Sequence, residues 1–197
     1  MTNNIDVQPS TFTRTDDDSS ADDPAPNSLV TLLVQCEAWI SLGDIEKTVN
    51  NAYNAVSACV PAVNGREVVV VLADDAELRS LNGRFRGKDK PTNVLSFPQI
   101  EDIAPYDSGM DLPLGDIIIA YETVLREADE ENKLTLHHFT HMIVHGLLHL
   151  AGFDHETSVD AEQMEALERE ILASMNIPDP YNSVANGLAE YPDRRCI

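Results

Sequence analysis

Three histidines, His145, His149 and His155, have a spacing that can bring them to one metal ion. The apolar pattern predicts a helix over residues 134–151, in which His145 and His149 form an i,i+4 pair about 5–6 Å apart at Cβ. Gly152 is expected to end this helix, because glycine readily adopts the left-handed conformation of a helix C-terminus. The chain can then turn and bring His155 to the same metal ion from outside the helix. Three imidazoles with an open fourth position are typical of a catalytic zinc site. The pattern therefore predicts a metal-dependent hydrolase.

The residue after the first histidine separates this pattern from that of a peptidase. The metzincin peptidases carry H-E-x-x-H-x-x-G-x-x-H, in which the glutamate is the general base that activates the zinc water. This chain has the three histidines and the glycine, but Gly146 stands in the place of the glutamate. The metal ligands are thus expected without the peptidase base. The alternative, that each histidine is a hydrogen-bonded core residue, fits one histidine better than three at this spacing.

The charge of the chain limits its partners. With 13 basic and 34 acidic residues the formal net charge is −21 at pH 7, which opposes non-specific attraction to nucleic acid or to an anionic membrane. A local basic segment is nevertheless present. Its basic residues are Arg79, Arg84, Arg86, Lys88 and Lys90, with Asp89 the only acid between them. Such a run can be a solvated surface or a phosphate-binding one. Trp39 and the few other aromatic residues form no evident platform for stacking bases.

Length and composition indicate one globular domain. A chain of 197 residues, 43% of them hydrophobic, can bury one substantial core, and two full domains are not expected. The three cysteines lack CxxC spacing, which favours neither a disulfide framework nor a thiolate zinc site and fits a reducing compartment. No signal peptide or membrane-spanning run is evident. A cytoplasmic protein is therefore expected.

The elements that must position the histidines follow from the hydrophobic periodicity. Strands are predicted at 29–36, 68–72, 92–97 and 117–120, helices at 44–60, 74–83, 121–131, 134–151 and 160–175, and a loop at 99–113. In the last helix, Met164, Leu167 and Ile171 are expected to line the apolar face, while Glu168 faces elsewhere. The order of elements predicts an α+β fold, zincin-like, in which a mixed β-sheet is packed with helices and the metal site lies at the end of a helix.

Three blocks of sequence resemble those of the YbeY family. They are LNGRFRGKDKPTNVLSFP at 81–98, LGDI at 114–117 and HMIVHGLLHLAGFDH at 141–155. The blocks occur in the family's order, and the resemblance covers residues 29–182, which we expect to form the hydrolase domain. Residues 1–28 are predicted to be a disordered acidic leader, and residues 183–197 a C-terminal tail.

This resemblance implies a zinc-dependent endoribonuclease specific for single-stranded RNA. The family acts in ribosomal RNA maturation, including the 3′ end of 16S RNA, and in ribosome quality control. One zinc ion would be held by His145, His149 and His155, and Arg86 matches a functionally important arginine of the family. Arg86 and His145 are thus the candidate catalytic residues. Expected partners are single-stranded RNA and ribosomes or small-subunit precursors, with neither membrane nor DNA among them. One departure is Phe153, where a tyrosine is common.

The chemistry of phosphodiester cleavage fits these residues. A zinc ion can polarise a phosphoryl oxygen, and the guanidinium of Arg86 can donate paired hydrogen bonds to the same phosphate. Two alternatives remain open. In a metallopeptidase or amidohydrolase, Asp154 or Glu156 would replace the missing base. In a non-catalytic ribosome assembly factor the zinc would be structural. His141, one helical turn before His145, could orient a ligand or serve the structure alone.

Overall fold

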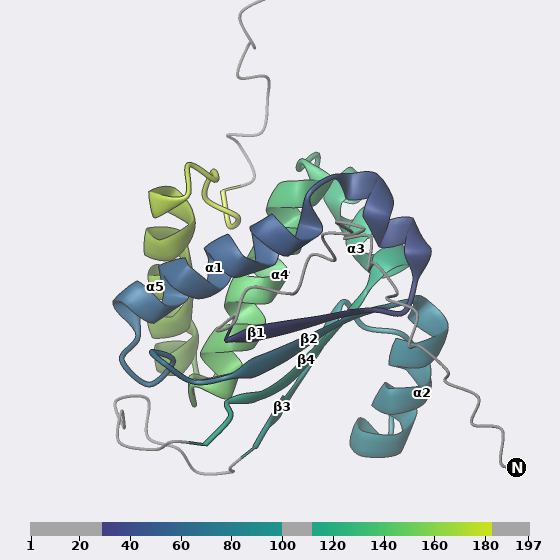
Figure 1. The fold of residues 1–197 in the computed structure, drawn as a ribbon, viewed down its shortest axis with the longest axis horizontal. Coiled ribbons are helices and arrows are strands. Elements are labelled where there is room, and N and C mark those ends of the chain that lie inside the picture. Colours follow the sequence, from purple (N-terminus) through teal and green to yellow (C-terminus); the bar gives the residue numbers. More distant parts are fainter. Residues whose placement is uncertain (1–28, 100–111, 183–197) are drawn as a thin grey trace, which may run out of the picture.

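A computed structural model of the protein describes residues 29–99 and 112–182, which form a four-stranded sheet flanked by helices (Figure 1). The strands are β1 (Val30–Val34), β2 (Val68–Ala73), β3 (Val94–Pro98) and β4 (Gly115–Ala120), in the spatial order β1-β2-β4-β3. The first three strands in this order are parallel, and β3 pairs antiparallel with β4. The mixed sheet confirms the predicted α+β class. The predicted leader and tail, and most of the predicted 99–113 loop, lie outside the described residues.

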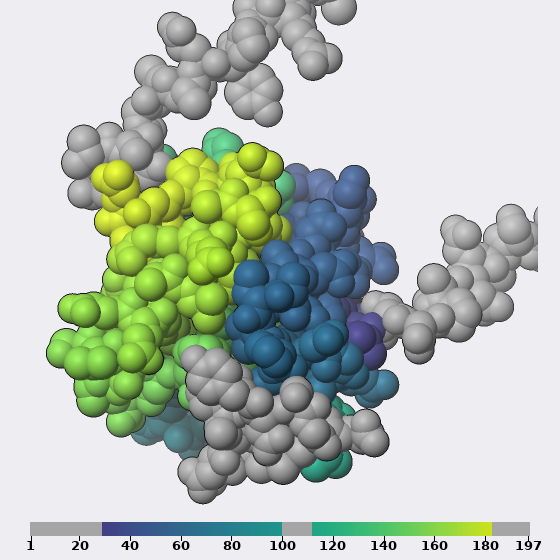
Figure 2. All heavy atoms as spheres, turned by 90° about the vertical axis from the view of Figure 1, so that its left-hand side faces the viewer, coloured from purple at the N-terminus to yellow at the C-terminus, as the bar shows by residue number. Residues whose placement is uncertain are grey.

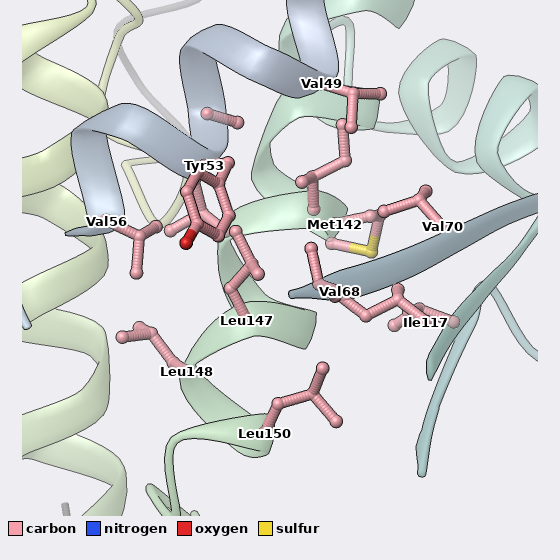
Figure 3. Packing of buried hydrophobic residues seen from close by; sticks show 14 of the residues in the cluster. Val49, Tyr53, Val56, Val68, Val70, Ile117, Met142, Leu147, Leu148 and Leu150 are labelled. Atoms are coloured by element: carbon pink, nitrogen blue, oxygen red, sulfur yellow. The ribbon is translucent and has the colours of Figure 1, made fainter. Parts of the chain in front are cut away.

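Helices cover both faces of the sheet, and the two faces bury different cores. Along β4, Ile117 and Ile119 belong to the larger core, while Ile118 lies in a smaller one, as expected when successive side chains of a strand point to opposite faces. The larger core lies under α1 (Ile45–Cys59) and α4 (Thr135–Leu150). Figure 3 shows side chains of α1 and α4 meeting those of β2 and β4 in this core. Helix α2 (Asp75–Arg86) contributes Leu78 to the smaller core.

Helix α4 ends in hydrogen bonds that turn the chain back toward the helix. The backbone N–H of Gly152 donates to the carbonyl of His149, and that of Phe153 donates to the carbonyl of Leu148. The donor–acceptor distance is 3.0 Å in both bonds. These two bonds form a Schellman motif, which needs a left-handed residue at its centre. Gly152 supplies it with φ +88°. The prediction that Gly152 ends the histidine helix is therefore confirmed.

Two elements differ from the sequence-based expectation. A 3₁₀ helix, η1 (Glu37–Leu42), was not predicted. It buries Trp39, whose indole N–H donates a hydrogen bond of 3.0 Å to the carbonyl of Ala73. Helix α2 does not end at Gly83 but continues to Arg86. The left-handed residue that ends it is Gly87, with φ +66°. A single glycine inside a helix weakens it without breaking it, and the helix ends only where the backbone leaves the helical conformation.

The C-terminal half of the domain contributes the helices that carry and flank the three histidines. Helix α3 (Tyr121–Glu130) precedes α4, and α5 (Ser158–Ser174) follows it and packs beside α1 (Figure 2). The hydroxyl of Thr157 caps α5 by accepting a hydrogen bond from the N–H of Asp160. One expectation for this helix was wrong: Glu168 is completely buried. Within residues 29–99 and 112–182, none of the helices has the length and apolar character of a membrane span.

Candidate metal centre

The structure brings the three predicted ligands together at the C-terminal end of α4. His145 and His149 lie one turn apart on this helix, and His155 comes from the segment that leads to α5. One ring nitrogen of each histidine lies within 4.8 Å of those of the other two. The rings of His145 and His149 have centroids 4.5 Å apart, and the ring of His155 lies 5.0 Å from that of His149. His155 is exposed, whereas the other two are partly buried, so the cluster opens to solvent on one side.

Hydrogen bonds fix which nitrogen of each helical histidine is available to a metal. The Nδ1 of His149 lies 3.0 Å from the carbonyl oxygen of Phe153. A carbonyl only accepts, so this nitrogen carries the proton and leaves Nε2 with a lone pair. The Nδ1 of His145 faces a carboxylate oxygen of Glu168 at 2.7 Å. Burial, together with the neighbouring His145 and His155, lowers the pKa of His149 to about 4, which keeps this imidazole neutral near pH 7.

The two bare nitrogens point at one another, and this arrangement fits a metal. The Nε2 atoms of His145 and His149 are 3.0 Å apart. Two lone pairs at this distance repel unless a proton or a metal ion lies between them. In a tetrahedral zinc site with Zn–N distances of about 2.0–2.1 Å, neighbouring nitrogen ligands lie about 3.3 Å apart. The donor set therefore fits a zinc ion, with His155 as the third ligand.

The buried carboxylate of Glu168 contacts His145 of the cluster. Glu168 reaches His145 with one oxygen, and its other oxygen accepts from the hydroxyl of Tyr181 and lies 3.1 Å from Nε2 of His141. Burial raises the pKa of Glu168, but the hydrogen bonds to His141 and His145 outweigh it and hold this pKa well below its ordinary value. Glu168 is therefore an anion, as the carboxylate partner of a metal-bound histidine usually is.

Sequence reasoning missed Glu168 and Tyr181, although a signal for the first was present. Position 168 lies four residues after Met164 and three before Ile171, which places it on the buried face of α5. A glutamate within an apolar stripe needs buried partners, and this requirement could have identified it. His141 lies 3.1 Å from a carboxylate oxygen of Glu168, and its ring lies edge-on to that of His145 with centroids 6.3 Å apart, but it does not belong to the three-histidine cluster.

Packing explains the residue that replaces the peptidase base. Gly146 is buried on the side of α4 that faces β4. A Cβ atom at this position would lie 2.9 Å from Cγ2 of Ile117 and 3.0 Å from its Cδ1, closer than carbon atoms pack. A glutamate at position 146 would therefore point into the sheet and not toward the histidines. This helix face provides close packing and offers no general base at position 146.

Phe153 contributes to the site through its backbone. Its carbonyl orients His149, and its side chain packs against the larger core. Asp154 is exposed, and one of its carboxylate oxygens accepts from the backbone N–H of His155 over 2.7 Å. This bond steadies the segment that carries the third candidate ligand.

Arg86 is exposed at the last residue of α2. Strand β3 links this end of α2 to the histidine helix. The ring of Phe85 packs against Phe97 of β3, with centroids 5.1 Å apart, and the hydroxyl of Ser96 in the same strand donates to the carbonyl of Gly146 over 3.3 Å. An alternative to a catalytic role for Arg86 is a structural ion pair with a carboxylate, but among residues 29–99 and 112–182 no carboxylate forms an ion pair with it. Its catalytic role stays a prediction.

An α+β domain with three converging histidines defines a class of candidate metalloproteins, and comparison with known proteins specifies the family. The family model described as "Endoribonuclease YbeY" matches residues 34–176. The chain belongs to this family, as the three sequence blocks predicted.

Two relatives that bear the family's name agree with this assignment. The endoribonuclease YbeY of Bradyrhizobium sp. strain BTAi1 is 49% identical over 160 residues, which cover 80% of this chain and 94% of the relative. That of Chelativorans sp. strain BNC1 is 52% identical over 143 residues, covering 73% and 86%. The solution structure of TM1509 from Thermotoga maritima has a TM-score of 0.49 and 25% identity, covering 78% of this chain and 99% of that one.

Proposed function

We propose that this protein is a zinc-dependent endoribonuclease that cleaves single-stranded RNA. The observation that carries the proposal is that the Nε2 atoms of His145 and His149 lie 3.0 Å apart, while the Nδ1 atom of each ring faces an oxygen acceptor on the opposite side. His155 completes the ligand set. Relatives that share about half of their residues with this chain bear the name endoribonuclease, which supports RNA as the substrate.

In this proposal, different residues of the chain bind the metal and the phosphate. The three histidines hold the metal, and Glu168 keeps His145 in the tautomer that presents Nε2. A zinc ion held there supplies Lewis acidity toward a phosphoryl oxygen. Arg86 is free of carboxylate partners among the described residues and can bind the phosphate with its planar fork of donors. We infer that Arg86 and His145 are the residues on which catalysis depends most.

The cellular substrate that we propose is ribosomal RNA, including the 3′ end of 16S RNA in small-subunit precursors. Family membership supports this role and a further one in ribosome quality control. A cytoplasmic location follows from such a substrate. The acidic chain, with its net charge of −21, gains little from general attraction to RNA, so a ribosomal particle that presents the strand would favour cleavage.

The test combines metal analysis of the purified full chain with cleavage of a defined single-stranded RNA. We expect about one zinc ion per chain, as the one-site geometry requires. Chelation and His145→Ala should both abolish cleavage, and Arg86→Glu should impair it strongly. His137→Ala is the matched control for the ligand, because His137 lies on the same helix outside the cluster, and Lys47→Glu is the control for charge reversal.

Two outcomes would overturn the proposal. Wild-type cleavage by a well-folded His145→Ala variant would show that another nuclease causes the activity. Binding to ribosomal particles without any cleavage, together with a lower melting temperature of His145→Ala, would indicate an assembly factor with a structural metal.

A further inference from the structure

Helix α2 and the segment after it contain five of the 13 basic residues of a chain that is strongly acidic as a whole. Arg79 forms paired hydrogen bonds with Asp89, over 2.7 and 2.9 Å, and so neutralises the only acid of the basic segment. Four exposed cations remain, and no ion pair involves any of them within residues 29–99 and 112–182. They are Arg84, Arg86, Lys88 and Lys90. In a chain of net charge −21, this segment offers a polyanion a local cationic surface within the described part of the chain.

An aromatic ring lies among these cations and remains open to solvent. The Phe85 side chain is 56% exposed, and the guanidinium carbon of Arg84 lies 5.1 Å from the centre of its ring. The other large apolar side chains exposed in the described part of the chain are aliphatic, except Tyr181. The hydroxyl of Tyr181 donates a hydrogen bond to Glu168, and the guanidinium of Arg169 lies over the Tyr181 ring. Phe85 is thus the accessible ring that no role in the core explains.

The ring is also held in place. Phe97, partly buried on β3, meets the Phe85 ring edge-on at an interplanar angle of 66°. The loop after α2 is anchored by Asn82, whose buried side chain donates to the carbonyl of Lys90 over 2.7 Å. A ring fixed by packing loses little conformational freedom when a ligand stacks on it.

We propose that Phe85 and the guanidinium of Arg84 form a stacking site for one unpaired base of the RNA, while Arg86, Lys88 and Lys90 bind the phosphates beside it. Single-stranded RNA is recognised by bases that stack on aromatic rings or on arginine planes, combined with a cationic path for the backbone. This inference rests on the proposed RNA substrate and names the feature of that substrate, an unstacked base, that the surface selects. It revises the expectation that the aromatic residues offer no stacking surface, because folding joins Phe85 to Phe97 and Arg84.

The test is binding of a 2′-O-methyl single-stranded oligoribonucleotide that contains one 2-aminopurine, with its integrity checked on a gel. For the full chain we expect quenching of the 2-aminopurine fluorescence. Phe85→Leu, which keeps an apolar side chain but removes the ring, should weaken binding about 5- to 100-fold, the usual effect of losing one stacked base. Phe85→Tyr should retain binding. Leu134→Ala is the control, because Leu134 is 63% exposed and lies outside the basic segment.

Salt dependence separates stacking from phosphate contacts. Phe85→Leu should leave the slope of log affinity against log salt unchanged, whereas Arg86→Gln should reduce its magnitude by about 0.7. A duplex of the same sequence should bind wild type and Phe85→Leu equally, since its bases are already stacked. Equal single-strand affinity of wild type and Phe85→Leu would overturn this inference even if RNA is cleaved. Ring-dependent binding without cleavage would instead uphold it and count against the proposed nuclease.

Discussion

Gly146 serves the packing of α4 at the position where the metzincin pattern has a catalytic glutamate. Its missing Cβ lets α4 lie against Ile117 of β4, and the two neighbouring turns of α4 then hold His145 and His149. The absence of a base at this position is therefore a consequence of the contact between helix and sheet. Any reconstruction of a peptidase site here would have to move the helix first.

Gly146→Ala is expected to destabilise the protein by about 1–3 kcal/mol, the usual cost of overpacking a core. Gly83→Ala is a suitable comparison, because the nearest atom to its added Cβ would be 4.0 Å away and the helix would gain about 0.5–1 kcal/mol. Urea unfolding followed by circular dichroism measures both changes. Equal effects of the two substitutions would contradict this account of Gly146.

The role proposed for Glu168 depends on its hydrogen bond with His145. Glu168→Gln preserves shape but removes the negative charge that faces His145, so metal affinity should fall about 10- to 100-fold. Competition with a chromophoric chelator gives the affinity, and Glu165→Gln on the same helix should leave it near the wild-type value. An unchanged affinity for Glu168→Gln would mean that this carboxylate serves stability alone.

Helices α3 and α4 are joined by a partly buried polar contact that should respond to pH. Glu127 of α3 lies 2.9 Å from Nε2 of His138 on α4 and accepts from the Asn93 side chain, over 3.0 Å. Burial raises the pKa of Glu127, but these hydrogen bonds outweigh it and lower the pKa below its ordinary value of 4.5. The ionised carboxylate therefore stabilises the folded state. That stabilisation is complete above the unfolded-state pKa and is lost as pH falls through the folded-state pKa.

The stability difference between wild type and Glu127→Gln should follow this titration. At pH 7 we expect a loss of about 1–3 kcal/mol in the variant, typical of a hydrogen bond to a charged group. The difference should shrink as the pH falls below 4.5, the ordinary pKa of this carboxyl group. Urea unfolding at several pH values provides the measurement. A difference that does not change with pH would show that the charge of Glu127 contributes nothing.

At the scale of the whole molecule, the candidate metal centre links segments that unfolding would separate. Its ligands come from α4 and from the segment before α5, and Glu168 adds α5 itself. A metal that binds only this folded arrangement stabilises it by mass action. At a free zinc concentration about 100 times the dissociation constant, the gain is about 2.7 kcal/mol.

Zinc should accordingly raise the melting temperature of the apo-protein by roughly 5–10 °C for a chain of this size. Differential scanning calorimetry with and without zinc measures the shift. His137→Ala should show it in full and His145→Ala should not. The same shift in both variants would place the zinc at some other site.

The sequence by itself determined the elements and the ligand spacing. Hydrophobic periodicity located the strands and most helices, and the i,i+4 histidines followed by glycine indicated one helix face and its end, because these properties depend on nearby residues. Tertiary structure alone decided that Glu168 faces His145, that Gly146 lies against Ile117, and that Phe97 supports Phe85. Each of these contacts joins two separate elements. Local preferences do not encode such distances, which arise only when helices and sheet pack into one core.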